Sequence, residues 1–254
     1  MTLTANTAPE WICHPSSFTS LGFSLGPTFG KGRPGSYSGG AKGRHLMPFG
    51  ERKNFGLQAE GEYIFYPRFR EGEFDAALLW RREIVQLGFA GSFKHIHDSS
   101  LGRGGGLGQA TFMADFLLPK VRFGFFGSKA FADEAPVSNL LTLRVVDQVG
   151  GNVQVGIKPR TYVDGTLAYL FTHAPMTPDM AGAQVRLTHF VARQIAVIVA
   201  VDINQTYVAT KTNGRFVVGL QFGRWSRPRD YTNRGNPLGA EIPRVHYQYS
   251  PRRP

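Results

Sequence analysis

The loops of this chain contain acidic residues and histidines, which are residue types that hydrolytic enzymes use in catalysis. A Ser/His/Asp group or a carboxylate pair would need such residues to cluster at one rim of the fold. The available residues are Asp98, Asp133, Glu134, His173 and Asp179. No motif selects them, so we expect no catalytic site and no cofactor.

Two histidines raise the question of a metal. His95 and His97 share a parity beside Asp98, so their imidazoles would point the same way along an extended chain. They could form a weak metal site at a loop. We interpret them instead as polar loop residues, and we expect no bound metal.

A larger set of charged residues recurs at alternate positions within apolar segments. Alternate side chains of a β-strand share a face, so these residues would lie opposite a face of Phe, Val and Leu. If the apolar face contacts lipid, the charged face encloses a lumen in which opposite charges pair and brace the wall. A permeation path or ligand cavity is the alternative. The predicted lumen-lining residues are Glu60, Glu62, Asp75, Lys94, Asp115, Arg122, Arg144, Asp164, Arg186 and Asp202.

The clearest pair of strands is QATFMADFLLPKVRFGFFGSKAF, at 109–131. Apolar residues alternate as far as Leu118, Pro119-Lys120 interrupts them, and the alternation then resumes. A proline cannot donate to a strand ladder, so this pattern predicts a tight hairpin. Each strand has about ten residues, the length that a transmembrane β-barrel requires. The same patterning over 55–225 predicts ten strands, with twelve as the alternative.

One predicted strand is longer than the others. Apolar residues share a parity over about 141–157, and Asp147 breaks that parity. The strand would therefore project beyond the membrane at this point or contain a bulge.

The predicted connections alternate between short and long along the chain. Outer-membrane barrels have short periplasmic turns, longer outer loops and an even number of strands. We therefore predict an all-β fold, an antiparallel up-and-down transmembrane β-barrel with both termini periplasmic. A water-soluble barrel with its apolar parity inside is the alternative, which strand length and loop alternation disfavour. The short connections are 82–83, 119–120, 158–161 and 192–194, and the long ones are 67–72, 97–107, 131–140, 172–182 and 208–214.

Aromatic residues gather near both ends of the predicted strands. Two such girdles are typical of barrels that cross a membrane, because aromatic rings favour the interface with water. The predicted interface aromatics are Tyr63, Trp80, Phe93, Phe125, Tyr169, Phe171, Tyr207 and Trp225.

The two ends of the chain differ from its centre. Residues 1–54 are rich in Gly, Ser and Pro, and we expect a flexible segment or a plug in the lumen. Residues 226–254 would form a basic periplasmic tail. Each end carries six Lys/Arg against two acids, so most of the net charge of +11 lies outside 55–225. We expect the basic ends to meet an anionic envelope surface, and we expect no nucleic-acid partner.

Other features of the sequence exclude simple alternatives. The glycines of the first segment lack Walker spacing, which argues against a phosphate loop. Cys13 is the one cysteine, so no disulfide can form within the chain. The first residues do not resemble a signal peptide, although a barrel must be exported. We expect the signal to have been removed or replaced.

A resemblance supports the barrel interpretation. Over about 55–225 the chain resembles the bacterial outer-membrane β-barrel superfamily. RFVVGLQFGRW, at 215–225, is similar to its closing-strand signal, although Trp225 stands one position late. Asp230-Tyr231 and Ile242-Pro243-Arg244 also resemble uncharacterised barrels of this type. The resemblance implies an outer-membrane location and almost nothing about function.

The functional hypothesis is structural. We expect an anchor or scaffold that contacts outer-membrane lipids. Its outer loops and basic periplasmic tails would be presented to other envelope proteins or the cell wall. A narrow porin-like channel for small solutes is the first alternative, and a surface enzyme is the second.

Overall fold

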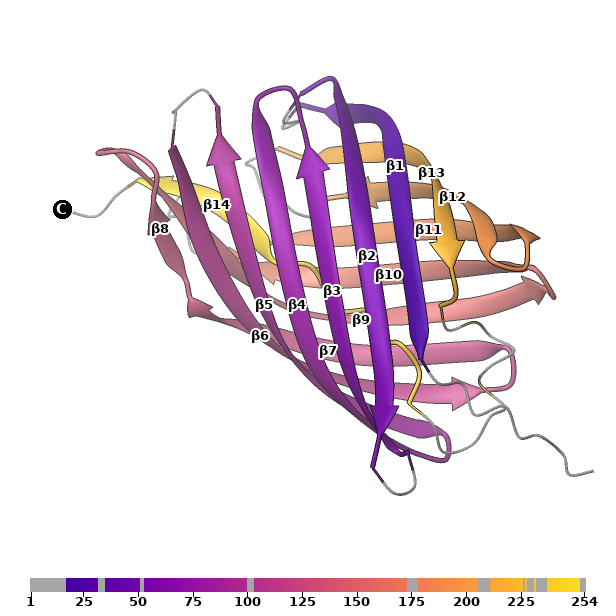
Figure 1. Cartoon of the computed structure of the whole chain (residues 1–254). Helices are drawn as coiled ribbons and strands as arrows, with labels where there is room; N and C mark the ends of the chain where they lie inside the picture. Colours follow the sequence, from indigo (N-terminus) through magenta and orange to yellow (C-terminus); the bar gives the residue numbers. More distant parts are fainter. Residues whose placement is uncertain are drawn as a thin grey trace, which may run out of the picture.

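The alternating segments of the sequence form a ring of antiparallel strands that closes on itself (Figure 1). The computed structural model describes residues 17–31, 35–50, 53–99, 103–172, 178–204, 211–225, 227, 231 and 237–251. Among these, twelve strands make up the barrel wall. They are β1 (Phe18–Gly30), β2 (Tyr37–Phe49), β3 (Phe55–Phe65), β4 (Phe69–Arg82), β5 (Val85–Asp98), β6 (Arg103–Leu118), β7 (Val121–Ala132), β9 (Leu141–Lys158), β10 (Thr161–Phe171), β11 (Met180–Ala192), β12 (Ile195–Ile203) and β13 (Asn213–Gly223).

The ring closes between β13 and β1, in a register that runs from Ser20 opposite Gly223 to Gly30 opposite Asn213. The all-β barrel prediction is thus confirmed, with twelve strands where the main interpretation had ten. The predicted closing strand at 215–225 corresponds to β13. Its partner is β1 rather than the strand at Phe55.

The expectation that residues 1–54 are flexible or plug the lumen is wrong for their described part. The segments 18–30 and 37–49 are wall strands, paired along almost their whole length. These segments contain many glycines, so they have few side chains from which an alternation of apolar and polar residues could be recognised. Some of these glycines are required: a Cβ at Gly26 would lie 1.9 Å from the carbonyl oxygen of Phe216 on β13.

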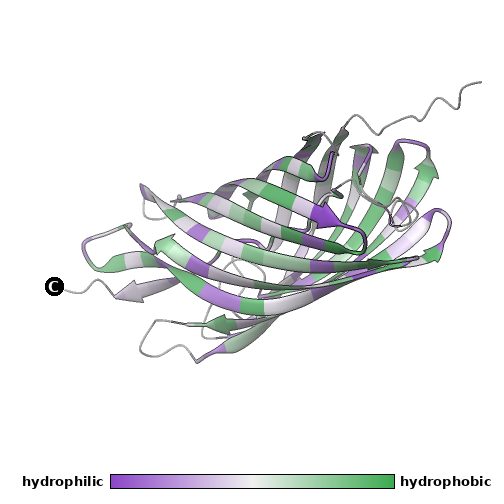
Figure 2. Cartoon of the chain, turned by 90° about the horizontal axis from the view of Figure 1, so that it is seen from below, coloured by the Kyte–Doolittle hydropathy of each residue, from purple (hydrophilic) through white to green (hydrophobic). Residues whose placement is uncertain are grey.

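Hydropathy alternates along the strands (Figure 2), and the apolar parity is the one exposed on the outside of the barrel. Mid-strand side chains such as Phe89, Phe112 and Phe125 are more than half exposed, whereas their sequence neighbours are buried. Exposure of such a belt to water would be unfavourable, whereas the hydrocarbon tails of a bilayer solvate it. The outer surface is therefore a lipid-contacting face, as the sequence predicted. No helix among the described residues has the length and hydropathy to cross a bilayer.

Short turns and longer loops lie at opposite rims. The short-turn rim carries the two-residue turns 83–84, 119–120, 159–160 and 193–194, whereas connections such as 133–140 and 172–179 lie at the long-loop rim. The predicted alternation is confirmed only in part. Two connections predicted to be long shrink to 66–68 and 99–102, and the short-turn rim also carries the five-residue connection 50–54.

At the long-loop rim the sheet continues past the ring. Asp147 on β9 is opposite Phe171, the last residue of β10, so Leu141–Val146 project beyond that neighbour. The projecting part pairs with two strands outside the ring, β8 (Glu134–Pro136) and β14 (His246–Pro251). Of the two explanations for Asp147, projection of the strand is the one observed.

Candidate functional site

The inward parity carries the polar residues of the wall. Seven of the ten predicted lumen-lining side chains are buried there, and Glu62, Arg144 and Arg186 are partly buried. Most of these charges pair with opposite charges. Asp115 accepts a hydrogen bond from Arg122 at 2.5 Å, Asp164 pairs with Arg186 at 3.2 Å, and Asp202 contacts Arg215. Glu134 pairs with Arg144 at the long-loop rim.

The described residues that follow β13, 227, 231 and 237–251, form the C-terminal segment. They lie in this lumen, between the short-turn rim and the long-loop rim. In Figure 1 the segment is the yellow chain that lies inside the ring and leads to β14. Its contacts follow the barrel axis: Tyr231 and Leu238 contact wall residues near the short turns, and Tyr249 contacts Asp98 at the end of β5. The expectation of a periplasmic tail at 226–254 is therefore wrong for the residues that the structure describes.

Trp225 begins this inward path and is not an interface aromatic as predicted. It is only 2% exposed, and the Arg44 guanidinium lies 5.1 Å from the centre of its ring. The cause is Gly223, whose φ of +89° ends the alternation of β13 and turns the chain inward. Gly239 lies against the indole, and a Cβ there would come within 2.3 Å of it.

Glutamine side chains hold the first extended part of the segment. Gln86 donates to the Leu238 carbonyl oxygen at 2.9 Å and accepts from the Leu238 N–H at 2.7 Å. Gln58 makes the same two contacts with Ala240, both at 2.8 Å. The two amides thus replace a neighbouring strand, and Arg122 donates to the carbonyl oxygen of Gly239 between them.

Charges dominate the middle of the lumen. Glu241 accepts two hydrogen bonds from Arg44, both at 2.9 Å, and one from Arg186 at 3.0 Å. Arg244 donates to Glu62 at 2.9 Å. One carboxylate and one guanidinium of the segment therefore complete ion pairs with three wall strands. The space left among these groups is a cavity of about 80 Å³.

The last part of the segment is fixed by acids of β4 and a lysine of β5. Glu73 accepts from the Val245 N–H at 2.8 Å, and Lys94 donates to the Val245 carbonyl oxygen at 2.9 Å. Lys94 also pairs with Glu71 and Glu73, at 3.1 and 3.0 Å. Tyr247 donates its hydroxyl proton to Glu71 at 2.7 Å. From His246 onward, β14 pairs with β9.

Apolar side chains fill the lumen above and below the charged zone. Toward the short turns, Trp225, Leu238 and Ile242 join a core that includes Leu79 and Met113. Toward the long loops, Val245 and Tyr247 join a second core with Ile64, Ile96 and Leu143. The lumen is therefore packed across two apolar layers.

The other predicted aromatics lie at several depths. Tyr63, Phe93, Phe125, Tyr169 and Phe171 are exposed on the outer face, and Trp80 is partly exposed. Tyr207 lies outside the described residues.

The rim residues with catalytic potential do not gather into one group. Asp98 accepts from Tyr249, Asp179 accepts from Thr172 and Tyr169, and Glu134 pairs with Arg144. His95 and His97 point outward, and His173 lies outside the described residues. In the part of the chain that is described, no three His, Cys, Asp or Glu side chains come close enough to hold a metal ion.

The partners of the C-terminal segment were missed from the sequence. Glu71, Glu73, Gln58 and Gln86 lie on the inward parity, which identifies them as lumen residues but not as ligands of a particular segment. The segment itself has one weak signal, the apolar alternation of Leu238, Ala240 and Ile242. Glu241 stands within that alternation.

Several solved structures resemble this fold. A membrane protein from work on in-meso crystallization matches with a TM-score of 0.58 and 9% identity, covering 92% of this chain and all of that one. Outer membrane phospholipase A from Escherichia coli matches with a TM-score of 0.51 and 9% identity, over 81% of this chain and 92% of that one. The KdgM porin matches with a TM-score of 0.49 and 13% identity, over 80% and 98%. No family model and no curated protein matches the sequence.

The closed ring, the apolar outer belt and these similarities define the class of protein. The chain is a transmembrane β-barrel, and its fold is similar to that of outer-membrane proteins of bacteria. Identities of 9–13% concern the fold alone. The barrel holds its C-terminal segment in the lumen.

Proposed function

We propose that this protein is a non-conducting anchor of the outer membrane. It holds its C-terminal segment through the barrel and presents β14 and the long loops to partner proteins on the outer side. The observation that carries the proposal is the filled lumen, in which wall side chains bind the backbone of the segment from Leu238 to Val245.

Energetics support a closed resting state. Each hydrogen bond contributes about 1 kcal/mol net, and more where one partner is charged. Withdrawal of the segment would break many such bonds at once. It would also leave Arg44 and Arg186 without the carboxylate of Glu241. Arg44 would keep Glu60 and Arg186 would keep Asp164, but each would lose its charged hydrogen bonds to the segment.

The narrow channel remains the alternative function. The mixed charges of the middle lumen would suit a polar path, and the cavity of about 80 Å³ lies among them. Only a few water molecules fit in such a volume, at about 30 Å³ each. Conduction would therefore require the segment to move.

Conductance in planar bilayers separates the two functions. We expect the full chain to show no stable open level. A chain that ends at Trp225 should conduct steadily, because its lumen loses the segment. The double substitution of Gln58→Leu and Gln86→Leu should give intermittent openings, since it removes four hydrogen bonds to the segment.

Matched controls make this experiment decisive. Gln109→Leu changes a buried inward glutamine whose side chain accepts a hydrogen bond from Gln148 of the wall, and it should leave the barrel closed. A stable conductance of the full chain would reject the anchor in favour of the channel. Equal closure of the shortened chain would show that the segment is not the plug.

We also propose that the protein is not an enzyme. The rim acids Asp98, Glu134 and Asp179 are each engaged with a different partner. Hydrolysis of phospholipid or peptide substrates that is lost in Asp98→Asn or Asp179→Asn would contradict this proposal.

A further inference from the structure

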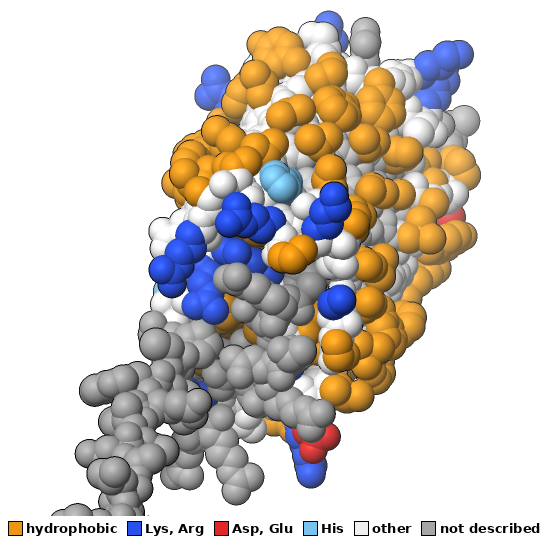
Figure 3. All heavy atoms as spheres, turned by 90° about the vertical axis from the view of Figure 1, so that its right-hand side faces the viewer, with side chains coloured by type: hydrophobic (Ala, Val, Ile, Leu, Met, Phe, Trp, Pro, Cys, Tyr) orange, Lys and Arg blue, Asp and Glu red, His pale blue; other side chains and the backbone are white. Residues whose placement is uncertain are grey.

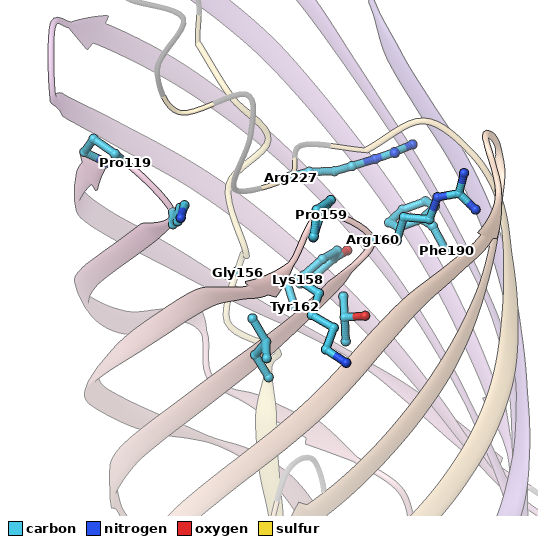
Figure 4. A pocket seen from close by; sticks show the side chains of 11 residues that line it. Pro119, Gly156, Lys158, Pro159, Arg160, Tyr162, Phe190 and Arg227 are labelled. Atoms are coloured by element: carbon cyan, nitrogen blue, oxygen red, sulfur yellow. The ribbon is translucent and has the colours of Figure 1, made fainter.

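A second cavity lies at the short-turn rim, away from the segment in the middle of the lumen. Its volume is about 450 Å³, and it lies beside the turns that follow β6 and β9 (Figure 4). Tyr162 and Phe190 line its inner side and are almost fully buried. Pro119, Ile157 and Pro159 add apolar surface.

Cations surround this apolar cavity. Lys120, Lys158, Arg160 and Arg227 line it, and no carboxylate is among its lining residues. Among the described residues, no ion pair engages Lys120, Lys158 or Arg160. The cavity thus concentrates positive charge next to apolar walls.

Backbone hydrogen bonds fix the turns that carry these cations. The N–H of Gly156 donates to the carbonyl oxygen of Lys120 at 2.8 Å, which ties the β6–β7 turn to β9. The N–H of Phe190 donates to the carbonyl oxygen of Arg160 at 2.8 Å. The guanidinium of Arg227 lies 3.6 Å from the centre of the Phe190 ring, and it donates to the carbonyl oxygen of Arg193 at 2.9 Å.

The surrounding surface is also basic. Lys and Arg side chains gather on the face that Figure 3 presents, and apolar residues of the outer belt border them. Lys120, Lys158, Arg160 and Arg193 are exposed at this rim, which is the periplasmic one in outer-membrane barrels.

The cavity meets the membrane at the depth of lipid headgroups. Ile157 is 58% exposed and continues the outward row of Val153 and Val155, so the apolar side of the cavity joins the lipid belt. Anionic headgroups of a leaflet attract basic residues at its surface. Apolar walls that join a hydrocarbon belt suit an acyl chain, and the cations suit the phosphate that carries it.

We propose that this cavity binds the phosphate headgroup of an anionic phospholipid from the periplasmic leaflet. Lys158 and Arg160 contact the phosphate from one turn, Lys120 from the neighbouring turn and Arg227 from the C-terminal segment. The upper part of an acyl chain lies along Pro119 and Ile157. The site would hold the barrel at a fixed depth and join the segment, through Arg227, to a bound lipid.

The test uses the full chain reconstituted in vesicles of equal parts phosphatidylglycerol and phosphatidylcholine. Mild detergent extraction followed by native mass spectrometry measures which lipid stays bound. We expect the folded protein to retain phosphatidylglycerol in preference. Each cation near an anionic surface contributes a factor of about five in binding. The double substitution of Lys158→Gln and Arg160→Gln should therefore lower the preference by about 25-fold.

The control is Arg103→Gln with Lys129→Gln, an exposed Arg and Lys at the other rim. This variant should keep the full preference, and boiling-dependent gel migration checks that both variants fold. Lys120→Gln alone, expected to lose about fivefold, serves if the double variant misfolds. An unchanged preference in the cavity variants, or an equal loss in the control, overturns the proposal. Displacement of the lipid by inorganic phosphate also overturns it, in favour of a site for a soluble anion.

Discussion

Most charged side chains inside this barrel are paired with a side chain of opposite charge. Lys94 lies between Glu71 and Glu73, and Arg122 pairs with Asp115. An uncompensated charge in an enclosed space is costly, which explains why most of the inward acids contact a base on a nearby strand. Arg44 and Arg186 each have a wall partner, Glu60 and Asp164, and they share a further carboxylate, Glu241, that comes from the C-terminal segment.

The substitution Glu241→Gln should therefore destabilise the barrel. It removes a charge that accepts three hydrogen bonds from two guanidinium groups. We expect the free energy of unfolding to fall by about 1–3 kcal/mol. Urea denaturation in lipid vesicles, followed by tryptophan fluorescence, measures the change.

Glu134→Gln provides the matched control. Glu134 also pairs with an arginine, Arg144, but its side chain is 45% exposed at the rim. An exposed pair contributes about 0–1 kcal/mol. Equal losses for the two substitutions would show that Glu241 has no special part in the lumen.

At the scale of elements, the C-terminal segment links the short-turn side of the lumen to the long-loop rim. Its direction follows from β14, which pairs antiparallel to β9 and so runs toward the long loops. Long loops face outward in outer-membrane barrels. We therefore expect His246–Pro251 on the outer side of the membrane, opposite the short-turn rim.

A cysteine reporter tests this direction. In a Cys13→Ser background, Pro251→Cys places a thiol at an exposed position of β14. A membrane-impermeant maleimide added to intact cells should label it. Lys158→Cys, exposed at the short-turn rim, should stay unlabelled until the envelope is permeabilised. The reverse pattern would mean that the barrel has the opposite orientation or that the segment does not pass through it.

At the scale of the whole molecule, the outer belt fixes the barrel in a bilayer. Phe89, near the middle of β5, is 59% exposed, and Phe131, near the long-loop end of β7, is 54% exposed. Equal exposure has different consequences at different depths, because lipid is least polar at its centre.

Arginine at these two positions should reveal the depth. Phe89→Arg should destabilise the barrel in the bilayer by about 2–4 kcal/mol. Phe131→Arg should destabilise it by about 0–1 kcal/mol. Reversible folding into vesicles over a denaturant series provides the measurement. A larger effect at Phe131 would contradict the position of the belt.

Local pattern determined much of this architecture. The alternation of Phe112 and Phe116 with Met113 and Asp115 specifies strands, and the membrane then decides which face is outside. Pro119-Lys120 marks a short turn by its own chemistry. Strand conformation, lumen parity and loop alternation could be predicted because each depends on residues that are close in sequence.

Tertiary structure decided how the ring closes and what fills it. The glycine-rich strand around Leu21 is stable because Gly43 and Phe222 flank it in the closed sheet, a partnership that no local period encodes. The C-terminal segment likewise binds Gln58 and Gln86, which precede it by 182 and 152 residues. Hydrogen-bond partners so distant in sequence meet only after the wall has formed. The sequence alone therefore does not distinguish a basic tail outside the barrel from a segment buried in its lumen.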